Sequence, residues 1–381
     1  MTVAGLILAG GAGERMRRSG ESDVPKPLIE LRGASLLERN VCALIGAGVR
    51  PIWIACRDRD GQTRAEVARL AALAHPGGVS VQTLLESRPL GTIGAAGLLR
   101  DRADAVLSVN ADNLTALDLG AMIERHIESR ADLTLAAHEH AWQLPYGELV
   151  TDGDRVLEYR EKPVTNTRVC SAVCALGPAA LALLDGPAGL PDLTGRMVER
   201  GGTVRAFHHR AAWIDINDAA DLARAEQMLA SGPDPFECWN RSPHVEVAGA
   251  LLCDGSRILL ERRVRGGQAL WDTPGGKLEP GESAAAALAR ELDEELGLRV
   301  VGAGPALARF DAIDEDGRVL RHHVFALRAR AADARPREGQ RLEWFELAAL
   351  PDDRARVVAR SLASLREPVG EVVAGAPSGA P

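Results

Sequence analysis

The sequence is poor in lysine. Of its 45 basic residues only three are lysines, Lys26, Lys162 and Lys277, and the other 42 are arginines. A codon bias would account for the excess of arginine. Under such a bias, the surviving lysines are expected where a compact ammonium is needed and a planar guanidinium does not fit. All three lie in distinctive local sequences (PKP, EKP and GGKLEPGE), which makes them candidate functional residues.

The sequence also lacks an apolar run long enough to span a membrane, and residues 3–9 are too short and too poorly flanked for a signal peptide. The six cysteines form no CxxC pair and mostly lie in apolar, strand-like runs, which is typical of reduced core residues in a cytoplasmic protein. A net charge of −8 argues against wholesale nucleic-acid binding. We therefore expect a cytoplasmic protein with neither membrane nor nucleic-acid partners, and an oligomer is compatible with these features.

At 381 residues the chain is too long for one ordinary domain, and we expect two. In the N-terminal part, apolar strand-like runs alternate with helix-like segments. This alternation predicts a doubly wound α/β domain with a parallel sheet and with ligands at the carboxyl ends of its strands. The expected strands are 3–8, 51–56, 79–85 and 105–110, and the expected helices are 35–45, 61–73, 91–99, 117–129 and 219–229.

A glycine-rich turn, AGGAGERM, follows the first expected strand. Gly10, Gly11 and Gly13 let backbone N–H groups approach an anion closely, which is typical of a phosphate-binding loop, although such turns are also common without a ligand. The turn is neither GxxxxGK nor GxGxxG. Arg15 follows within the turn, and farther on two prolines flank Lys26 and fix the direction of its ammonium.

Carboxylates mark the ends of later segments. Asp112 in NADN lies at the carboxyl end of the fourth expected strand, where a metal-binding aspartate would face a triphosphate; a helix-capping role is the alternative. The motifs YGE (146–148), EKP (161–163) and WIDI (213–216) follow, with a hairpin turn expected at 152–154.

In this order and spacing, LAGGAGERM, PKPL, Glu86 with PLGT, NADN, YGE, EKP and WIDI resemble the motifs of the sugar-1-phosphate nucleotidyltransferases (NDP-sugar pyrophosphorylases) over about residues 1–230. The resemblance implies a Rossmann-like fold and transfer of a nucleotidyl group from a nucleoside triphosphate (NTP) to a sugar 1-phosphate. It implies these roles: Gly10, Gly11 and Gly13 hold the NTP, Arg15 and Lys26 balance phosphate charge in catalysis, Gly91 and Thr92 border the base and sugar, Asp112 and Asp215 bind Mg²⁺, and Gly147, Glu161 and Lys162 hold the sugar phosphate. The attacking phosphate oxygen is already ionised, so alignment and charge neutralisation are needed rather than a general base.

The sequence departs from this family after Arg15, where MRRSGES replaces the usual LxPLT, so the loop does not fix the nucleotide. PLGT and the lack of β-helix repeats resemble mannose- or heptose-1-phosphate guanylyltransferases, which favours GTP. A non-sugar acceptor, such as choline phosphate or a phosphonate, would use the same phosphate machinery. The polar residues Trp142, Gln143 and Glu161 slightly favour a sugar.

In the C-terminal third, residues 283–296 predict a helix that ends at Gly297, because alanine and leucine are frequent and neither proline nor glycine interrupts them. Glu291, Glu294 and Glu295 then share one face. Such carboxylates raise one another's pKa unless a cation lies between them, and Mg²⁺ or Mn²⁺ is the usual oxygen-bound ion. A solvated acidic face is the alternative.

Two features favour the metal site: the preceding loop is rich in turn residues, and Arg290 can bind Glu282 in a bidentate pair. Gly276, Glu282, REL (290–292), EE (294–295) and GL (297–298) have the spacing of the complete Nudix box, which they resemble without departure. The resemblance covers roughly residues 244–365. The resemblance implies a Mg²⁺-dependent hydrolase of a nucleoside diphosphate linked to another group.

The same resemblance implies that Arg262 and Arg263 contact phosphates, that Glu294 or Glu338 serves as general base, and that Glu338 is a further metal ligand; an exposed loop glutamate is the alternative for Glu338. The expected organisation is a nucleotidyltransferase domain (1–231), a linker (232–243), an α/β/α Nudix domain (244–367) and a disordered tail (368–381). Either domain could instead bind nucleotide without turnover, as a sensor.

Overall fold

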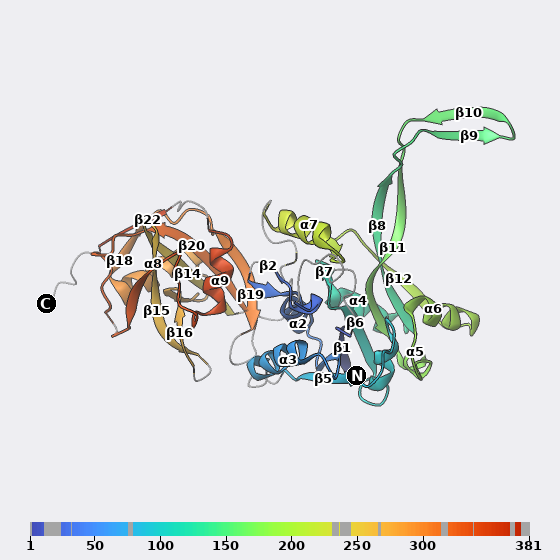
Figure 1. The fold of residues 1–381 in the computed structure, drawn as a ribbon, viewed down its shortest axis with the longest axis horizontal. Helices are drawn as coiled ribbons and strands as arrows, with labels where there is room; N and C mark the ends of the chain where they lie inside the picture. Colours follow the sequence, from blue (N-terminus) through green and yellow to red (C-terminus); the bar gives the residue numbers. More distant parts are fainter. Residues whose placement is uncertain are drawn as a thin grey trace.

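The computed structural model describes residues 2–10, 24–31, 33–74, 79–230, 236, 245–265, 268–313, 319–337, 339–365 and 370–374. Within these residues the chain forms a seven-stranded sheet from its N-terminal part and a nine-stranded sheet from its C-terminal third. Figure 1 shows the two sheets as neighbouring units, each with helices packed on it.

The strands of the N-terminal sheet are β1 (Val3–Leu8), β4 (Ile52–Arg57), β5 (Val81–Glu86), β6 (Ala105–Asn110), β8 (Leu133–Gln143), β11 (Val164–Leu176) and β12 (Val204–His209). Their order is β12-β8-β11-β6-β1-β4-β5, and all neighbours are parallel except β11, which runs antiparallel to β6 and β8. The prediction of a parallel sheet is correct for β6, β1, β4 and β5, whereas β11 makes the complete sheet mixed.

Helices cover both faces of this sheet, as expected for a doubly wound fold. They are α2 (Leu36–Gly46), α3 (Gly61–Ala74), η2 (Gly94–Leu99), α4 (Leu119–Glu128), α5 (Pro178–Ala182) and α6 (Leu190–Glu199), while α7 (Ala219–Ala230) packs in a separate cluster with residues such as Leu114 and Ile214. Apolar residues of α2, α3 and α4 pack on one face, and those of η2, α5 and α6 pack on the other.

The helix expected at 91–99 is only a short 3₁₀ helix, η2, which begins at Gly94. Gly94 and Gly97 lie against the backbone of Gly186 and Leu184, so closely that a Cβ atom at either position would overlap a carbonyl oxygen. Glycine is a poor α-helix former, and here it serves close backbone packing instead.

Short elements complete the N-terminal part: η1 (Lys26–Leu28), β2 (Glu30–Leu31), β3 (Ala34–Ser35), β7 (Asn113–Thr115), β13 (Trp213–Asp215), β9 (Glu148–Asp152) and β10 (Arg155–Arg160). The outer ends of β8 and β11 leave the sheet as a twisted ribbon that ends in the β9–β10 hairpin, which Figure 1 shows projecting far from the body. The hairpin turns at Gly153 (φ 60°), as predicted. We call residues 141–166 the arm.

The C-terminal sheet consists of β14 (Val245–Asp254), β15 (Arg257–Arg265), β16 (Gln268–Asp272), β17 (Gly275–Lys277), β18 (Leu298–Val301), β19 (Ala308–Ile313), β20 (Val319–Arg328), β21 (Leu342–Glu346) and β22 (Gly370–Ala374). Helix α8 (Ala284–Leu296) packs on one face, and α9 (Arg356–Leu362) packs on the other. This is the expected α/β/α arrangement.

Residues 370–374, predicted to be part of a disordered tail, instead form β22. This strand pairs with β18 along four residues and with the end of β20, and Val372 is buried. The free edge of β18 satisfies the backbone hydrogen bonds of β22, and composition alone does not reveal such a partner.

The two units share an apolar contact. Ile313 and Val319, at the ends of β19 and β20, belong to the same buried cluster as Val41 and Leu44 of α2. Arg360 of α9 is buried beside Gly33, and Arg356 forms an ion pair with Glu38 of α2.

Among the described residues, no helix is long and apolar enough to cross a membrane. Cys42, Cys56, Cys174 and Cys253 are buried and free, as predicted for core cysteines. Cys170 is an exception, because it lies in the outer part of β11 and is exposed.

Candidate active sites

The first candidate site is built from two aspartates that β7 and β13 bring together. Asp112 occupies the turn between β6 and β7, at the carboxyl end of a central strand, and Asp215 ends β13. The two short strands pair antiparallel with Asp215 opposite Asn113, and the Ile216 N–H donates to the Asp112 carbonyl at 3.0 Å. Residues about one hundred positions apart thus become neighbours at the sheet edge where a doubly wound fold binds ligands.

A lysine and an asparagine complete this cluster. Lys26 Nζ lies 3.2 Å from Asp112 Oδ2 and 3.4 Å from Asn217 Oδ1, and Asn217 Nδ2 donates to Asp215 Oδ2 at 3.0 Å. Among the described residues, Asp215 Oδ1 is buried and has no hydrogen-bond partner. Burial raises the pKa of Asp215, and the nearby Asp112 charge raises it further. A buried, unsatisfied carboxylate oxygen beside a second carboxylate is suited to a divalent cation.

Asn40 holds the Asp112 turn in place. Its amide is buried in α2 and donates to the carbonyls of Ala111 (3.3 Å) and Asn113 (3.1 Å), on both sides of Asp112. Asn40 was not predicted as a site residue, although an asparagine in the apolar face of an expected helix was a usable signal.

A second missed feature is a group of rings beside Asn113. The Asn113 amide donates to the Ser171 carbonyl, and Ser171 Oγ lies 2.9 Å from His209 Nε2. The His209 ring lies 5.1 Å from that of His138, and burial, followed by the His138 charge, lowers the pKa of His209 to about 4. His209 is therefore neutral at physiological pH.

The glycine-rich turn is described only as far as Gly10. A Cβ atom there would lie 2.7 Å from Oε1 of Glu86, a buried carboxyl group that also accepts from the Leu90 N–H. Gly11, Gly13 and Arg15 lie outside the described residues.

Gly91 and Thr92 have packing roles in the structure. Gly91 has φ +79°, and a Cβ atom at this position would lie 2.5 Å from the Ala188 carbonyl oxygen. Thr92 Oγ1 accepts from the Leu190 N–H at 3.2 Å. Both residues therefore anchor the segment that leads into α6.

The three residues predicted to hold the sugar phosphate lie on the arm. Gly147 packs against the ring of Tyr159, whose hydroxyl donates to Glu161 at 3.0 Å, and Lys162 adopts a left-handed backbone conformation (φ 43°). Lys162 precedes Ser171, beside the aspartate site, by nine residues, most of them in extended β11. At about 3.3 Å per residue, roughly 25–30 Å separate the two ends. The structure does not bring the arm residues to the aspartates of the same chain.

The second candidate site lies at the start and on one face of α8. Ser283 caps the helix by accepting from the Ala286 N–H at 3.2 Å, and Gly297 ends it with φ 65°. Leu288, Leu292 and Leu296 are fully buried against the sheet, and the acidic residues lie beside this apolar stripe, with Glu295 next to it and Glu294 toward solvent. These bounds agree with the helix expected from the sequence.

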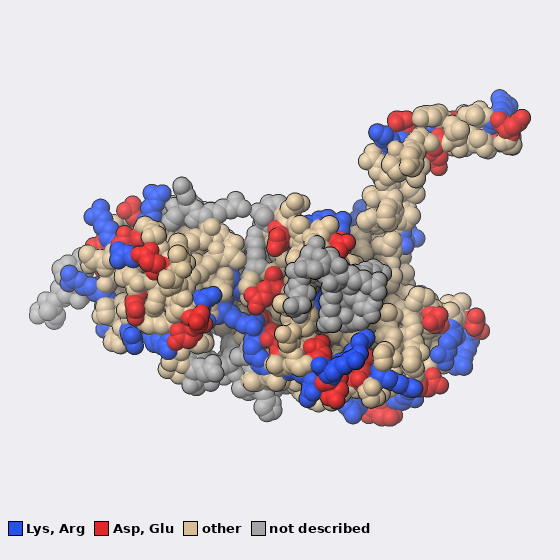
Figure 2. All heavy atoms as spheres, in the orientation of Figure 1, with Lys and Arg blue, Asp and Glu red and all other residues tan. Residues whose placement is uncertain are grey.

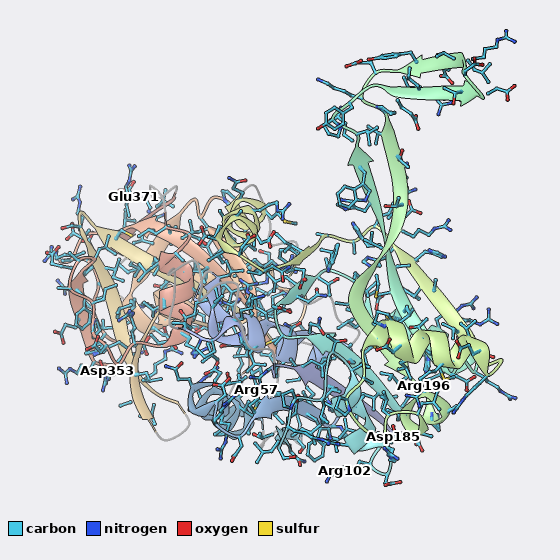
Figure 3. The ribbon with its side chains drawn as sticks, turned by 45° about the vertical axis from the view of Figure 1, so that its right-hand side comes forward. Arg57, Arg102, Asp185, Arg196, Asp353 and Glu371 are labelled. Atoms are coloured by element: carbon cyan, nitrogen blue, oxygen red, sulfur yellow. The ribbon has the colours of Figure 1, made fainter. Side chains whose placement is uncertain are left out.

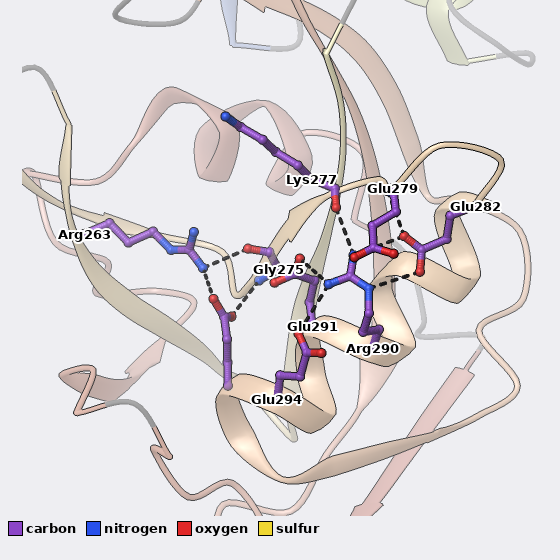
Figure 4. Close-up of polar contacts among 9 residues, drawn as sticks. Arg263, Gly275, Lys277, Glu279, Glu282, Arg290, Glu291 and Glu294 are labelled. Carbon is purple, nitrogen blue, oxygen red and sulfur yellow. Dashed lines mark hydrogen bonds and ion pairs between the residues drawn. The ribbon is translucent and has the colours of Figure 1, made fainter.

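Arg290 organises the loop in front of this helix, as Figure 4 shows. Its guanidinium binds both carboxylate oxygens of Glu282, at 3.2 and 3.0 Å, and also donates to the Lys277 carbonyl at 3.0 Å. The predicted bidentate pair is therefore present, and it ties the glycine-rich loop to α8.

Each of the three predicted metal-binding glutamates has a basic or backbone partner. Arg290 lies 2.8 Å from Glu291 and 3.3 Å from Glu294, while Glu295 accepts from Arg263 (2.7 Å) and from the Gly275 N–H (3.3 Å). Glu294 is about half exposed, whereas Glu295 is nearly buried, and burial raises the pKa of Glu295 to about 7. Within the described residues, no group of three or more acidic, histidine or cysteine side chains converges as a ready metal cage.

Two family models match this chain. The nucleotidyl transferase model matches residues 4–232, which is more than half of the chain, and the NUDIX domain model matches residues 243–365. The chain belongs to the nucleotidyl transferase family and carries a C-terminal NUDIX domain.

Relatives of the nucleotidyl transferase domain act on sugar phosphates by name. The mannose-1-phosphate guanyltransferase of Pichia angusta is 26% identical over 230 residues, which are 58% of this chain and 62% of that protein. The D-glycero-alpha-D-manno-heptose 1-phosphate guanylyltransferase of Aneurinibacillus thermoaerophilus is 31% identical over 159 residues, 41% of this chain and 66% of that protein. The chain thus covers less than two thirds of the length of each. The crystal structure of HddC from Yersinia pseudotuberculosis is 25% identical, covers 60% of this chain and all of that chain, and gives a TM-score of 0.46.

The two arginines of the NUDIX domain that were expected to contact phosphates have acidic partners within the domain. Arg263 binds Glu261 and Glu295, so it serves as an internal counter-ion within the acidic cluster. Arg262 forms an ion pair with Asp353 at 2.6 Å and lies over the ring of Trp271. Glu338 lies outside the described residues.

Proposed function

We propose that this chain is an enzyme with two active sites. The nucleotidyl transferase domain transfers a nucleotidyl group from an NTP to a sugar 1-phosphate, giving an NDP-sugar and pyrophosphate. The NUDIX domain hydrolyses a nucleoside diphosphate derivative or an NTP. The observation that carries the first activity is the buried Oδ1 of Asp215, which has no hydrogen-bond partner among the described residues and lies beside Asp112 and Lys26.

In the first reaction, Asp112 and Asp215 are the residues that would hold a divalent cation, Mg²⁺ or Mn²⁺. When bound, such an ion neutralises charge on the phosphates. Lys26 supplies a compact positive charge at the same place, and the backbone at Gly10 allows close approach of the triphosphate. A phosphate oxygen of the acceptor forms a bond to the α-phosphorus as the bond to pyrophosphate breaks. The nucleophile carries its negative charge already, so no residue has to remove a proton.

We further propose a guanine nucleotide and a sugar acceptor for this domain. Support comes from the relatives, which are named for guanylyl transfer to mannose 1-phosphate and to a heptose 1-phosphate. Glu161 and Lys162 on the arm would bind the hydroxyl and phosphate groups of that acceptor.

For the NUDIX domain we propose hydrolysis in which Glu291, Glu294 and Glu295 would hold a divalent cation. Glu294 or Glu338 would act as the base. Glu294 is the most exposed of the three helical glutamates, so water and substrate can reach it. The arginine partners of this trio also fit the alternative that the domain binds nucleotide without turnover. A product assay decides between the two.

The test is a screen of the full-length protein with the four common NTPs against a panel of sugar 1-phosphates, with choline phosphate as a non-sugar control. It is repeated with Asp112→Asn and Glu294→Gln. We expect Asp112→Asn to abolish only NDP-sugar formation and Glu294→Gln to abolish only hydrolysis. Loss of both activities in either variant would rule out independent sites, and absence of hydrolysis in the wild type would favour a sensor.

A further inference from the structure

The arm exposes many large apolar side chains. It carries both tyrosines of the chain, Tyr146 and Tyr159, with exposures of 74% and 61%. Trp142, Leu144, Leu149, Val156, Leu157 and Val164 are also exposed on it. Figure 2 shows the arm as predominantly uncharged, with its charged side chains gathered mainly toward the tip and the bend. Exposed tyrosine, tryptophan and leucine side chains gathered on one element are typical of a protein interface.

The arm also lacks the packing that a hairpin needs. Every residue of β10 is exposed, and β9 has no fully buried residue. Figure 3 shows the side chains of this hairpin extending away from the rest of the chain. An isolated two-stranded hairpin is marginally stable at best in water, so a stable arm requires a covering surface.

The arm carries functional groups in a defined arrangement. Gly147 lies against Tyr159, and Tyr159 orients Glu161 by a hydrogen bond. Lys162 follows with φ 43°, a conformation that costs energy for a residue other than glycine and that is often kept at binding sites. Lys162 lies roughly 25–30 Å along β11 from Ser171, which contacts Asn113 beside the aspartate site of the same chain.

We propose that a second copy of this chain covers the arm, and that each arm delivers Gly147, Glu161 and Lys162 to the aspartate site of its partner. The inference rests on the proposed nucleotidyl transfer. Within one chain, Asp112 and Asp215, which would act on the triphosphate, lie in the body of the domain, whereas the acceptor-binding residues lie on the arm. The aspartate site of a second copy needs the acceptor-binding groups that the arm carries, and that copy supplies a protein surface to cover the arm. Two-fold symmetry closes this exchange, with two identical contacts and no free arm.

The first experiment measures oligomeric state, independently of activity. Sedimentation velocity of the full-length wild type is expected to show a dimer. The double substitution Leu149→Glu and Leu157→Glu, on the apolar part of the arm, should yield monomers. The matched control is Val198→Glu on α6, an equally exposed apolar residue outside the arm, which should stay dimeric. A wild-type monomer at assay concentration, or a dimer that survives the arm substitutions, overturns the proposal.

The second experiment asks which chain's arm serves each site. Differently tagged chains are co-expressed, and the heterodimers are purified over both tags. One chain carries Asp112→Asn and the other carries Lys162→Ala; each homodimer should be at least tenfold less active than the wild type. If arms act on the partner, one site of this heterodimer is intact, and it should show about half the wild-type transferase activity. If arms act on their own chain, it should be inactive.

A reciprocal heterodimer contains the same two substitutions in one chain and none in the other. Here an arm that serves the partner leaves no intact site, whereas an arm that serves its own chain leaves one, so the expected activities reverse. Recovery in this second heterodimer overturns the proposal, as does a fully active Lys162→Ala homodimer. An arm-dependent dimer without transferase activity in the wild type would refute the proposed function and leave the interface standing. An active monomer would do the opposite.

Discussion

The two acidic clusters of this chain differ in how their carboxylates are satisfied. In the nucleotidyl transferase domain, Asp112 and Asp215 lie at strand ends and share Lys26 and Asn217 as neighbours. Within the described part of the chain, one buried oxygen, Asp215 Oδ1, has no hydrogen-bond partner. In the NUDIX domain, three glutamates on one helix are all held by arginines or by the backbone.

This difference indicates two ways of preparing a cation site. Among the described residues, the aspartate pair keeps one buried carboxylate oxygen, Asp215 Oδ1, open to a cation, and β7, β13 and Asn40 fix the pair in place. In the glutamate trio every member has an arginine or backbone partner, so a cation there must compete with Arg263 and Arg290. We therefore expect the aspartate site to bind Mg²⁺ without rearrangement and the glutamate site to bind it with movement of arginine side chains.

The largest effect on activity, and the sharpest test of the difference between the two acidic clusters, is expected from Asp215→Asn. The substitution keeps the shape of the side chain but removes the buried charge, so transferase turnover should fall about 10³-fold, as when a key electrostatic group is removed. Hydrolysis by the NUDIX domain should change less than about twofold. Product formation is measured by chromatography for both activities. A fall in both rates, or in neither, would break the distinction between the two clusters.

The next effect concerns the charge balance of the NUDIX cluster. Arg263→Ala removes the arginine shared by Glu261 and Glu295, two nearly buried carboxylates, and should cost about 3 kcal/mol of unfolding free energy at pH 8. The pKa of Glu295 is already raised to about 7 in the folded protein. For an acid with a raised folded pKa, the cost of its charge is fully present above that pKa and is relieved as the pH falls toward 4.5, its ordinary value.

The stability difference between Arg263→Ala and the wild type should therefore shrink as the pH falls from 8 to 5. Urea unfolding at several pH values measures it. Arg257→Ala, which breaks a largely exposed ion pair with Asp254, is the matched control and should cost less than about 1 kcal/mol at every pH. Equal losses in the two variants would show that burial of the cluster does not govern its stability.

Local signals in the sequence were sufficient where neighbouring residues decide the structure. The bounds of α8 follow from Ser283 and Gly297, and β1 and β6 follow from short apolar runs. The pairing of Glu282 with Arg290 also followed from their spacing.

Local signals failed where a distant partner decides. Nothing in the sequence near residue 370 reveals that β18 is available to pair with it, so the residues of β22 were predicted to belong to a disordered tail. The sequence of the arm also does not reveal its exposure, because only the topology shows that its strands project without a covering element among the described residues. The sequence near Arg263 likewise does not reveal its ion pair with Glu295, which lies 32 residues away.

A third prediction probes how tightly the NUDIX glutamates are held. Gly276 lies against the Glu291 carboxylate, and a Cβ atom at Gly276 would overlap that group. Gly276→Ala should displace the end of this flexible side chain at little cost in stability but lower hydrolysis about tenfold, because a small misplacement of a reacting group is costly. Steady-state hydrolysis rates measure the loss. Gly195→Ala on α6, where a Cβ meets nothing within 4 Å, should leave both activities unchanged.

The smallest expected effect tests whether the two clusters are independent. Arg356 of the NUDIX unit reaches Glu38 and Glu66 of the nucleotidyl transferase unit, where Arg69 also binds both glutamates. Because Arg69 remains and Arg356 is 38% exposed, Arg356→Ala should cost only about 0.5 kcal/mol of unfolding free energy.

Asn40, two residues beyond Glu38 in α2, holds the Asp112 turn, so a mechanical link between the domains would pass through this helix. A change of more than twofold in the transferase rate of Arg356→Ala, without a matching change in urea unfolding, would reveal such a link. Unchanged rates would show that the contact between the domains, which includes Ile313 and Val319, only holds them together.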